Sequence, residues 1–228
     1  MRIINILHFE KIDSTNTYAR NNIRNLPLPS IIIAEEQTAG RGRRGNSFFS
    51  PKETGLYMTL VIDEPVKSDL ITPATAVAVC KVLERKGIKP EIKWVNDLFI
   101  NNKKFCGILS ERIITETGNV IAIGIGINLT TKTFPDDLPS AGSINLETEK
   151  ISLAKEIATE VIIQINSSET VSEYRERLFI LGKEIEYSYN GIICSAKAVN
   201  INEYCNLTVL NTDGTLRVLT SGEISIKI

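Results

Sequence analysis

The amino-acid sequence predicts an α+β fold followed by a small β-barrel-like unit. Two segments, residues 73–87 and 151–165, carry apolar side chains at helical spacing. Between them, three β-type runs are separated by turn residues, which favours antiparallel hairpins. After Gly182 the sequence shows only short strands with Asn-Gly and Asp-Gly turns. We therefore expect two parts, residues 1–181 and residues 182–228.

The first half of the chain is predicted to contain a short helix, two buried strands and a longer helix. The short helix begins after Asp13 or Ser14, either of which can act as its N-cap. The longer helix ends with basic residues and Gly87, as expected at a helix C-terminus. In order, these elements cover residues 16–23, 31–34, 56–63 and 73–87.

The second half begins with β-type runs and continues with two amphipathic helices. The runs cover residues 91–97, 98–113 and 120–129, and the helices cover residues 151–165 and 171–181. Asn101 and Asn102 are typical of a turn. The part after Gly182 is too small to be very stable alone, so we expect it to dock on the larger part.

Composition narrows the function before any motif is considered. The formal net charge of −1 disfavours a general nucleic-acid binder. The four cysteines form no Cys-x-x-Cys pair, so we expect reduced thiols in a cytoplasmic protein without a zinc site. Because His8 is the single histidine, a histidine-activated nucleophile is disfavoured. No run approaches the roughly 20 apolar residues of a membrane span.

A loop of glycine and arginine, QTAGRGRRGNSFFSP at residues 37–51, is the most unusual segment. Its glycines match G-x-G-x-x-G, but no helix fits between Gly45 and the next strand, which excludes a dinucleotide-binding βαβ unit. The missing G-K-[ST] excludes a P-loop. Glycine raises the entropy lost on ordering and like charges repel, so Arg41, Arg43 and Arg44 are best accommodated around an anion.

Phe48 and Phe49 directly follow these arginines. They offer a flat apolar face beside the cations, of the kind that covers a nucleobase or another ring. The alternative interpretation is that they are ordinary core residues after a loop whose arginines are solvated turn charges.

A second cluster is EIKWVNDL, where Lys93 alternates with apolar residues on a strand expected to be mostly buried. Lys93 must therefore reach the surface or point into a polar pocket. Asn96 and Asp97 follow at the strand end, and a cation, an amide and a carboxylate this close suit phosphate with Mg²⁺. The competing interpretation is a surface lysine before an Asn-Asp turn.

Two further motifs are weak by themselves. GIGINL has glycines at alternate strand positions, which indicates close approach of another backbone or a ligand, and it contains Asn128. DSTNT is explained by helix capping through Ser14 and Thr15 without any ligand.

A series of motifs occurs in chain order, followed by a small β unit that ends in SGEISIKI: DSTN, QTAGRGRRG, KWVNDL, GILSE and GIGINL. On these motifs, the chain closely resembles the biotin protein ligases (biotin–acetyl-CoA-carboxylase ligases). The resemblance covers nearly the whole chain from Ile12 onward. It implies a class II aminoacyl-tRNA-synthetase/biotin-ligase-like catalytic core of mixed sheet with flanking helices, followed by a small SH3-like β-barrel domain. The sequence departs from the family at Val95, where proline is usual, and at Phe48, where bacterial relatives often have tryptophan.

The resemblance also implies a two-step reaction. ATP, with Mg²⁺ on its phosphates, activates biotin to biotinyl-5′-AMP, and a specific lysine of a biotin carboxyl carrier protein then attacks this mixed anhydride. The winged-helix domain of some members is expected to be absent, so no DNA partner is expected. No membrane partner is expected either, because no apolar run is long enough to span a membrane. Some members pair through sheet edges, which leaves a homodimer open.

Site residues follow from the motif positions. Lys93 and Arg43 are implied to be catalytic, because they would stabilise charge where two anions meet. The residues implied to bind biotin are Ser14, Thr15, Asn16, Gln37, Arg41, Gly42, Arg43 and Lys93. The residues implied to bind ATP and the adenylate are Arg41, Arg43, Phe48, Lys93, Asn96 and Asn128.

Three other functions compete with this interpretation. A lipoate or octanoate ligase would share the core architecture and a similar lysine, but the GRGRRG loop argues against it. An RNA-binding module would use the arginine loop and bind oligonucleotides in a salt-sensitive way. A non-catalytic biotin or nucleotide sensor would keep the same cationic positions.

Overall fold

A computed structural model describes residues 4–65, 67–116, 118–220, 222 and 224–226. Its larger part is a seven-stranded sheet in the order β1-β2-β3-β7-β6-β5-β4. Strands β1 and β2 are parallel and every other neighbouring pair is antiparallel. The strands are β1 (Asn5–Ile12), β2 (Ser30–Gln37), β3 (Gly55–Asp63), β4 (Glu91–Lys93), β5 (Asp97–Ile100), β6 (Lys103–Thr115) and β7 (Gly118–Asn128).

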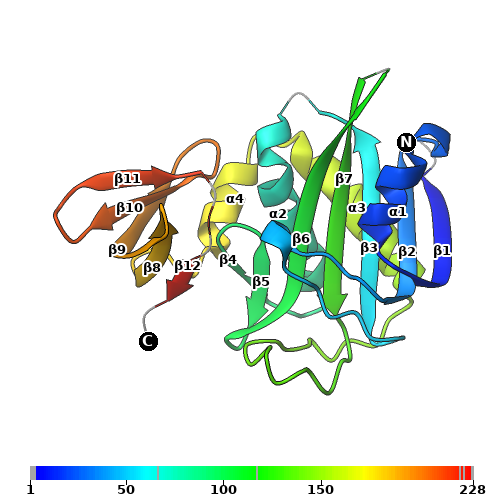
Figure 1. Cartoon of the computed structure of the whole chain (residues 1–228), viewed down its shortest axis with the longest axis horizontal. Helices are drawn as coiled ribbons and strands as arrows, with labels where there is room; N and C mark the ends of the chain where they lie inside the picture. Colours follow the sequence, from blue (N-terminus) through cyan, green and yellow to red (C-terminus); the bar gives the residue numbers. More distant parts are fainter. Residues whose placement is uncertain (1–3, 66, 117, 221, 223, 227–228) are drawn as a thin grey trace.

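Helices cover both faces of this sheet (Figure 1). Ile31 and Ile33 of β2 belong to the large core that includes α2 and α3, whereas Ile32 packs with Ala19 of α1 on the other face. A strand buried on both faces carries apolar residues in succession, which explains the run at the start of β2. The helices are α1 (Thr15–Asn22), α2 (Ile71–Glu84), α3 (Lys150–Ile165) and α4 (Thr170–Arg177), with short 3₁₀ turns η1 (Ile23–Asn25), η2 (Arg43–Gly45) and η3 (Ser68–Leu70).

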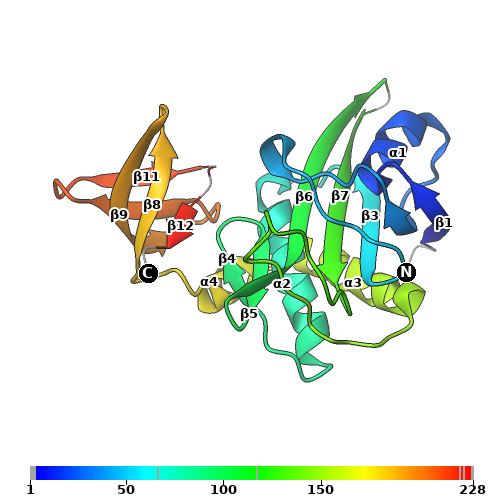
Figure 2. The same cartoon turned by 60° about the horizontal axis from the view of Figure 1, so that its bottom comes forward.

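The C-terminal part is a separate antiparallel sheet in the order β11-β10-β9-β8-β12. It lies beside α4 and β4 and away from the β1 edge of the large sheet, as Figures 1 and 2 show. The indole Nε1 of Trp94 donates to the carbonyl of Cys205 at 2.8 Å, and this bond ties the two sheets together. The strands are β8 (Glu184–Tyr189), β9 (Ile192–Ile201), β10 (Leu207–Asn211), β11 (Leu216–Leu219) and β12 (Ile224–Ile226).

The predicted α+β class is confirmed, as is the turn at Asn101 and Asn102, where φ is 49° and 60°. Ser14 is the N-cap of α1, because its side chain accepts a hydrogen bond from the Thr17 amide. The SH3-like form of the second sheet and its boundary at residue 182 stay predictions.

The structure corrects the sequence prediction at β1 and α4. Strand β1 was not predicted, because none of its residues is fully buried and its sequence has neither strict alternation nor a long apolar run. Helix α4 ends at Arg177 and does not continue to residue 181, because Leu178 is extended and pairs with Ile92 of β4. Among the described residues, no helix is long and apolar enough to cross a membrane.

Candidate active site

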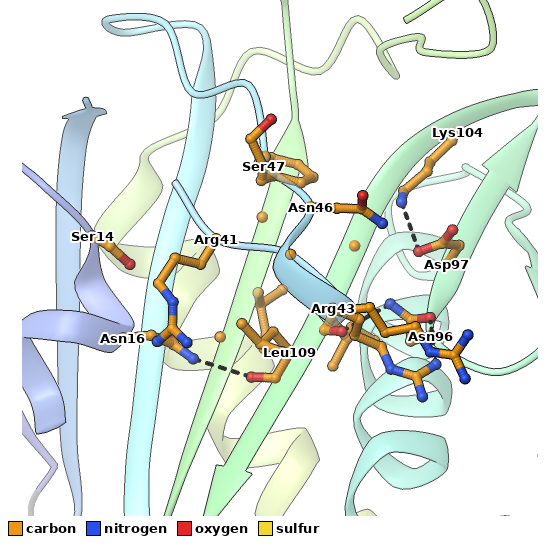
Figure 3. Close-up of a pocket in the computed structure, with 18 of the residues that line it drawn as sticks. Ser14, Asn16, Arg41, Arg43, Asn46, Ser47, Asn96, Asp97, Lys104 and Leu109 are labelled. Atoms are coloured by element: carbon orange, nitrogen blue, oxygen red, sulfur yellow. Dashed lines mark hydrogen bonds and ion pairs between the residues drawn. The ribbon is translucent and has the colours of Figure 1, made fainter. Parts of the chain in front are cut away.

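A cavity of 260 Å³ lies where the start of α1, the glycine loop and the centres of β6 and β7 meet (Figure 3). Gly222 and Ile224 of the C-terminal part also line it. The structure brings all predicted site residues to this cavity except Asn128: the lining includes Ser14, Thr15, Asn16, Gln37, Arg41, Gly42, Arg43, Phe48, Lys93 and Asn96. Segments that are far apart in sequence therefore form one site.

One end of the cavity is a neutral hydrogen-bonded network. Gln37 accepts from the amide of Thr15 at 2.9 Å and from its hydroxyl at 3.2 Å. The amide group of Gln37 donates to Ser50 at 2.9 Å, so its orientation is fixed. Ser14, Thr15 and Asn16 are each less than 5% exposed. Because α1 starts here, its first turn places short polar side chains inside the fold.

Asn16 is held in one orientation by three groups from two strands, β3 and β6. Its Oδ1 accepts from the Thr59 hydroxyl at 2.5 Å, and its Nδ2 donates to Glu111 at 2.9 Å and to the Leu109 carbonyl at 3.3 Å. A Cβ atom at Gly124 of β7 would lie 2.3 Å from Asn16 Oδ1. The missing side chain at Gly124 therefore makes room for Asn16.

Phe48 lies against two other glycines of the sheet. A Cβ atom at Gly126 would lie 2.5 Å from the Phe48 ring, and one at Gly107 would lie 3.3 Å from it. The ring also meets Tyr57 edge-to-face at 6.4 Å between centroids. The alternate glycines predicted to mark a close approach thus accommodate side chains from α1 and from the glycine loop.

The other end of the cavity is cationic. Arg43 Nη1 donates to Asn96 Oδ1 at 3.3 Å, and Lys93 pairs in register with Asp97 across the β4–β5 turn. Lys104, which the sequence analysis did not single out, lines the same end and forms a 2.8 Å ion pair with Asp97 (Figure 3). With Lys-Lys directly after an Asn-Asn turn, Lys104 resembles an ordinary surface residue in the sequence.

Arg41 has a different environment from Arg43. Both of its terminal nitrogens donate to Glu111, at 2.8 Å and 2.9 Å, so its forked donors face a protein carboxylate. Glu111 is the final residue of the GILSE motif, and nothing in that motif by itself indicated this contact.

Asn128 lies outside the cavity lining. Its side-chain nitrogen donates to the Gly142 carbonyl at 3.0 Å, which joins the end of β7 to the loop that precedes α3. The carbonyl of Asn128 in turn accepts from the Ile144 amide at 3.2 Å.

Two buried acidic side chains near the site, a tyrosine and a cysteine, stay in their neutral, protonated forms. Burial raises the pKa of Tyr57 to about 12 and raises the pKa of Cys106 well above its usual value. Cys106 therefore stays a thiol near neutral pH and is not available as a nucleophile. This agrees with chemistry that needs no covalent enzyme intermediate.

The described residues offer little for a protein-built metal centre. They contain no group of three or more His, Cys, Asp or Glu side chains arranged to hold a metal ion. Asp97 is the only acid among the described residues that line the cavity, and it is already paired with Lys104. Mg²⁺ commonly binds through one or two carboxylates together with substrate phosphates, so the site fits an ion that arrives with a nucleotide.

Comparison with known proteins gives consistent matches. Residues 8–128 match the model of the biotin/lipoate A/B protein ligase family. The bifunctional ligase/repressor BirA of Salmonella typhimurium is 30% identical, over 98% of this chain and 74% of its own length. The biotin–[acetyl-CoA-carboxylase] ligase of Paracoccus denitrificans is 31% identical, over 59% of this chain and 56% of its own. The biotin protein ligase from Aquifex aeolicus in complex with biotin and ATP has a TM-score of 0.84 at 22% identity, with 98% of each chain covered, so the fold is shared.

Proposed function

The chain belongs to the biotin/lipoate A/B protein ligase family, and we propose that it is a biotin protein ligase that uses ATP. The observation that carries this proposal is the division of one cavity into two chemically different ends. Thr15, Asn16 and Gln37 form a neutral polar network at one end. Arg43 and Lys93 line the other end, where two anionic groups can meet.

The neutral end favours biotin over lipoate. The ureido ring of biotin has two N–H donors and a carbonyl acceptor, whereas the dithiolane ring of lipoate has no such groups. Asn16 uses both amide hydrogens within the protein, and its Oδ1 accepts from Thr59 with one lone pair, which leaves the second lone pair for a ureido N–H. Buried polar groups left unpaired by lipoate would be costly, so discrimination is strong.

In the first step, a carboxylate oxygen of biotin attacks the α-phosphorus of ATP. The new O–P bond forms as the bond from the α-phosphorus to the bridging oxygen breaks, and pyrophosphate leaves. Arg43 and Lys93 offset the repulsion between carboxylate and triphosphate and stabilise the charge that grows on the phosphate oxygens. Phe48, resting on Gly107 and Gly126, offers its ring to the adenine.

Mg²⁺ would be held mainly by the ATP phosphates, with Asp97 as the one acidic side chain among the described residues of the lining, and would neutralise charge on the departing pyrophosphate. In the second step, the amine of a lysine in a biotin carboxyl carrier domain attacks the acyl carbon of biotinyl-5′-AMP. The amide bond forms and AMP leaves with the electron pair of the acyl–oxygen bond. The glycine loop keeps water from the anhydride until that lysine arrives.

Mass spectrometry of a carrier domain tests the proposal directly. After incubation with MgATP, this protein and either biotin or lipoate, we expect the added mass of one biotin on the domain and none of lipoate. Modification by lipoate, or by neither acid, would overturn the assignment.

Pyrophosphate exchange tests the two catalytic cations. We expect Lys93→Ala and Arg43→Ala to fold as the wild type does but to lose most of the biotin-dependent exchange, or to release the adenylate. Lys89→Ala, at an exposed lysine in the loop before β4, is the matched control. Wild-type exchange rates in both site variants would contradict these roles.

A further inference from the structure

Glu111 on β6 is a meeting point for three side chains from two other segments. Its carboxylate accepts from Asn16 at 2.9 Å and from both terminal nitrogens of Arg41 at 2.8 Å and 2.9 Å. Arg20 of α1 forms an ion pair with the same group. The Glu111 side chain is only 15% exposed, yet it is not part of the cavity lining. It therefore lies behind residues that do line the cavity.

The contact with Arg41 fixes the base of the glycine loop. Two parallel N–H···O bonds between a guanidinium and a carboxylate set both distance and orientation. Arg41 directly precedes Gly42 in the loop, and the Gly42 amide donates to the Asn46 carbonyl at 2.7 Å. A loop so rich in glycine has high entropy when free, so an anchor at its first arginine limits the positions open to Arg43 and Phe48.

From this geometry we propose that Glu111 is a positioning residue of the ligase reaction. It anchors Arg41 so that the glycine loop lies over the cavity, and it orients the Asn16 amide group by accepting a hydrogen bond from Nδ2. Arg41 thus acts through its contact with Glu111, and Arg43 and Lys93 are the residues that contact the anionic groups of the substrates. This inference rests on the proposed function for its kinetic part only.

A carboxylate is needed because Arg41 contacts both of its oxygens and balances its charge, while Asn16 donates to one of the same oxygens. Glutamine keeps the length of the side chain, but its NH₂ group would face the guanidinium of Arg41, where only an acceptor fits. Aspartate keeps the charge but is shorter by one methylene, so it can be expected to restore part of the effect. Glu111→Gln and Glu111→Asp therefore separate charge from size.

Amide hydrogen exchange of the ligand-free protein tests the anchor without any enzymatic activity. In Glu111→Gln we expect the amides of residues 40–47 to exchange about tenfold faster than in the wild type, because the loop loses a two-point contact with a partly buried carboxylate. Glu116→Gln is the matched control, since Glu116 pairs with Arg24 at 3.0 Å near the exposed tip of the same hairpin. Equal exchange in the wild type and Glu111→Gln would overturn the anchor.

Steady-state kinetics test the positioning role. In Glu111→Gln we expect KM for biotin to rise about tenfold and adenylate to dissociate faster, with a smaller change in kcat, and Glu111→Asp to recover part of the loss. Arg41→Gln should give the part of these changes that comes from the loop, and the double variant should be no worse than Glu111→Gln alone. Additive losses would show that Arg41 contacts the anion itself and would overturn the proposal.

The two sets of results separate failure of this inference from failure of the proposed function. If the wild type forms no biotinyl-5′-AMP, the ligase assignment is wrong. The amide hydrogen-exchange measurement then still decides whether Glu111 anchors the loop. If the wild type is active but Glu111→Gln matches it in exchange and in KM, only the role of Glu111 is wrong.

Discussion

Gly124→Ala is the substitution whose effect follows most directly from the geometry. The added Cβ would lie 2.3 Å from Oδ1 and 2.9 Å from Cγ of Asn16. Strand β7 cannot retreat, because Gly124 pairs with Thr59 of β3 on one side and with Leu109 of β6 on the other. The Asn16 amide must therefore move by about 1 Å, which is enough to break hydrogen bonds of ordinary length.

Two opposing effects decide the magnitude. Asn16 would lose its bonds to Thr59 and Glu111, which are buried and in one case charged, at a cost of about 1–2 kcal/mol each. Replacing glycine by alanine in a strand restores roughly 0.5–1 kcal/mol through the entropy of the unfolded chain. The loss of hydrogen bonds dominates, so we expect the free energy of unfolding to fall by about 2 kcal/mol.

Urea unfolding and calorimetric titration with biotin measure this effect. We expect the biotin dissociation constant of Gly124→Ala to rise at least about tenfold, because the acceptor on Asn16 is displaced. Gly126→Ala is the matched comparison: its Cβ would meet the Phe48 ring at 2.5 Å, so ATP affinity should fall while biotin affinity is kept. Wild-type stability and biotin affinity in Gly124→Ala would refute the fixed orientation of Asn16.

Three further outcomes are expected. Phe48→Ala should raise KM for ATP about tenfold in pyrophosphate exchange, and an unchanged KM would show that the adenine does not stack on the Phe48 ring. Burial raises the pKa of Glu35, but the hydrogen bonds and positive charges of Lys150 and His8 together outweigh burial and hold that pKa below its usual value. These interactions thus stabilise the protein above the usual carboxyl pKa and lose their effect as pH falls through the lowered pKa of Glu35. Glu35→Gln should unfold more easily than the wild type at neutral pH, and the difference should disappear as the pH is lowered through that pKa. Trp94→Phe should lower the free energy of unfolding by about 1–2 kcal/mol in urea, since it leaves the buried Cys205 carbonyl unpaired, and no loss would mean that this bond does not join the two sheets.

Local patterns determined much of the fold. Apolar spacing was sufficient for α2 and α3, because both helices bury a continuous face under the sheet. The turn at Asn101 and Asn102 needed only residues that accept a positive φ. Strand β1 was missed because an edge strand with no fully buried residue gives a weak apolar signal, and its parallel pairing with β2 depends on the crossover through α1.

The sequence by itself determined which chemical groups are available to this protein: a glycine loop with arginines, a lysine before Asn-Asp, short polar residues at a helix start, and alternate glycines on a strand. Only the tertiary structure decided which of these groups meet. Arg41 faces Glu111, 70 residues away, and Asn128 is turned to the loop beyond β7 and away from the cavity. The physical reason is that these contacts depend on the register of β6 against β7 and on the packing of α1 across both, and register is set by pairings between distant segments.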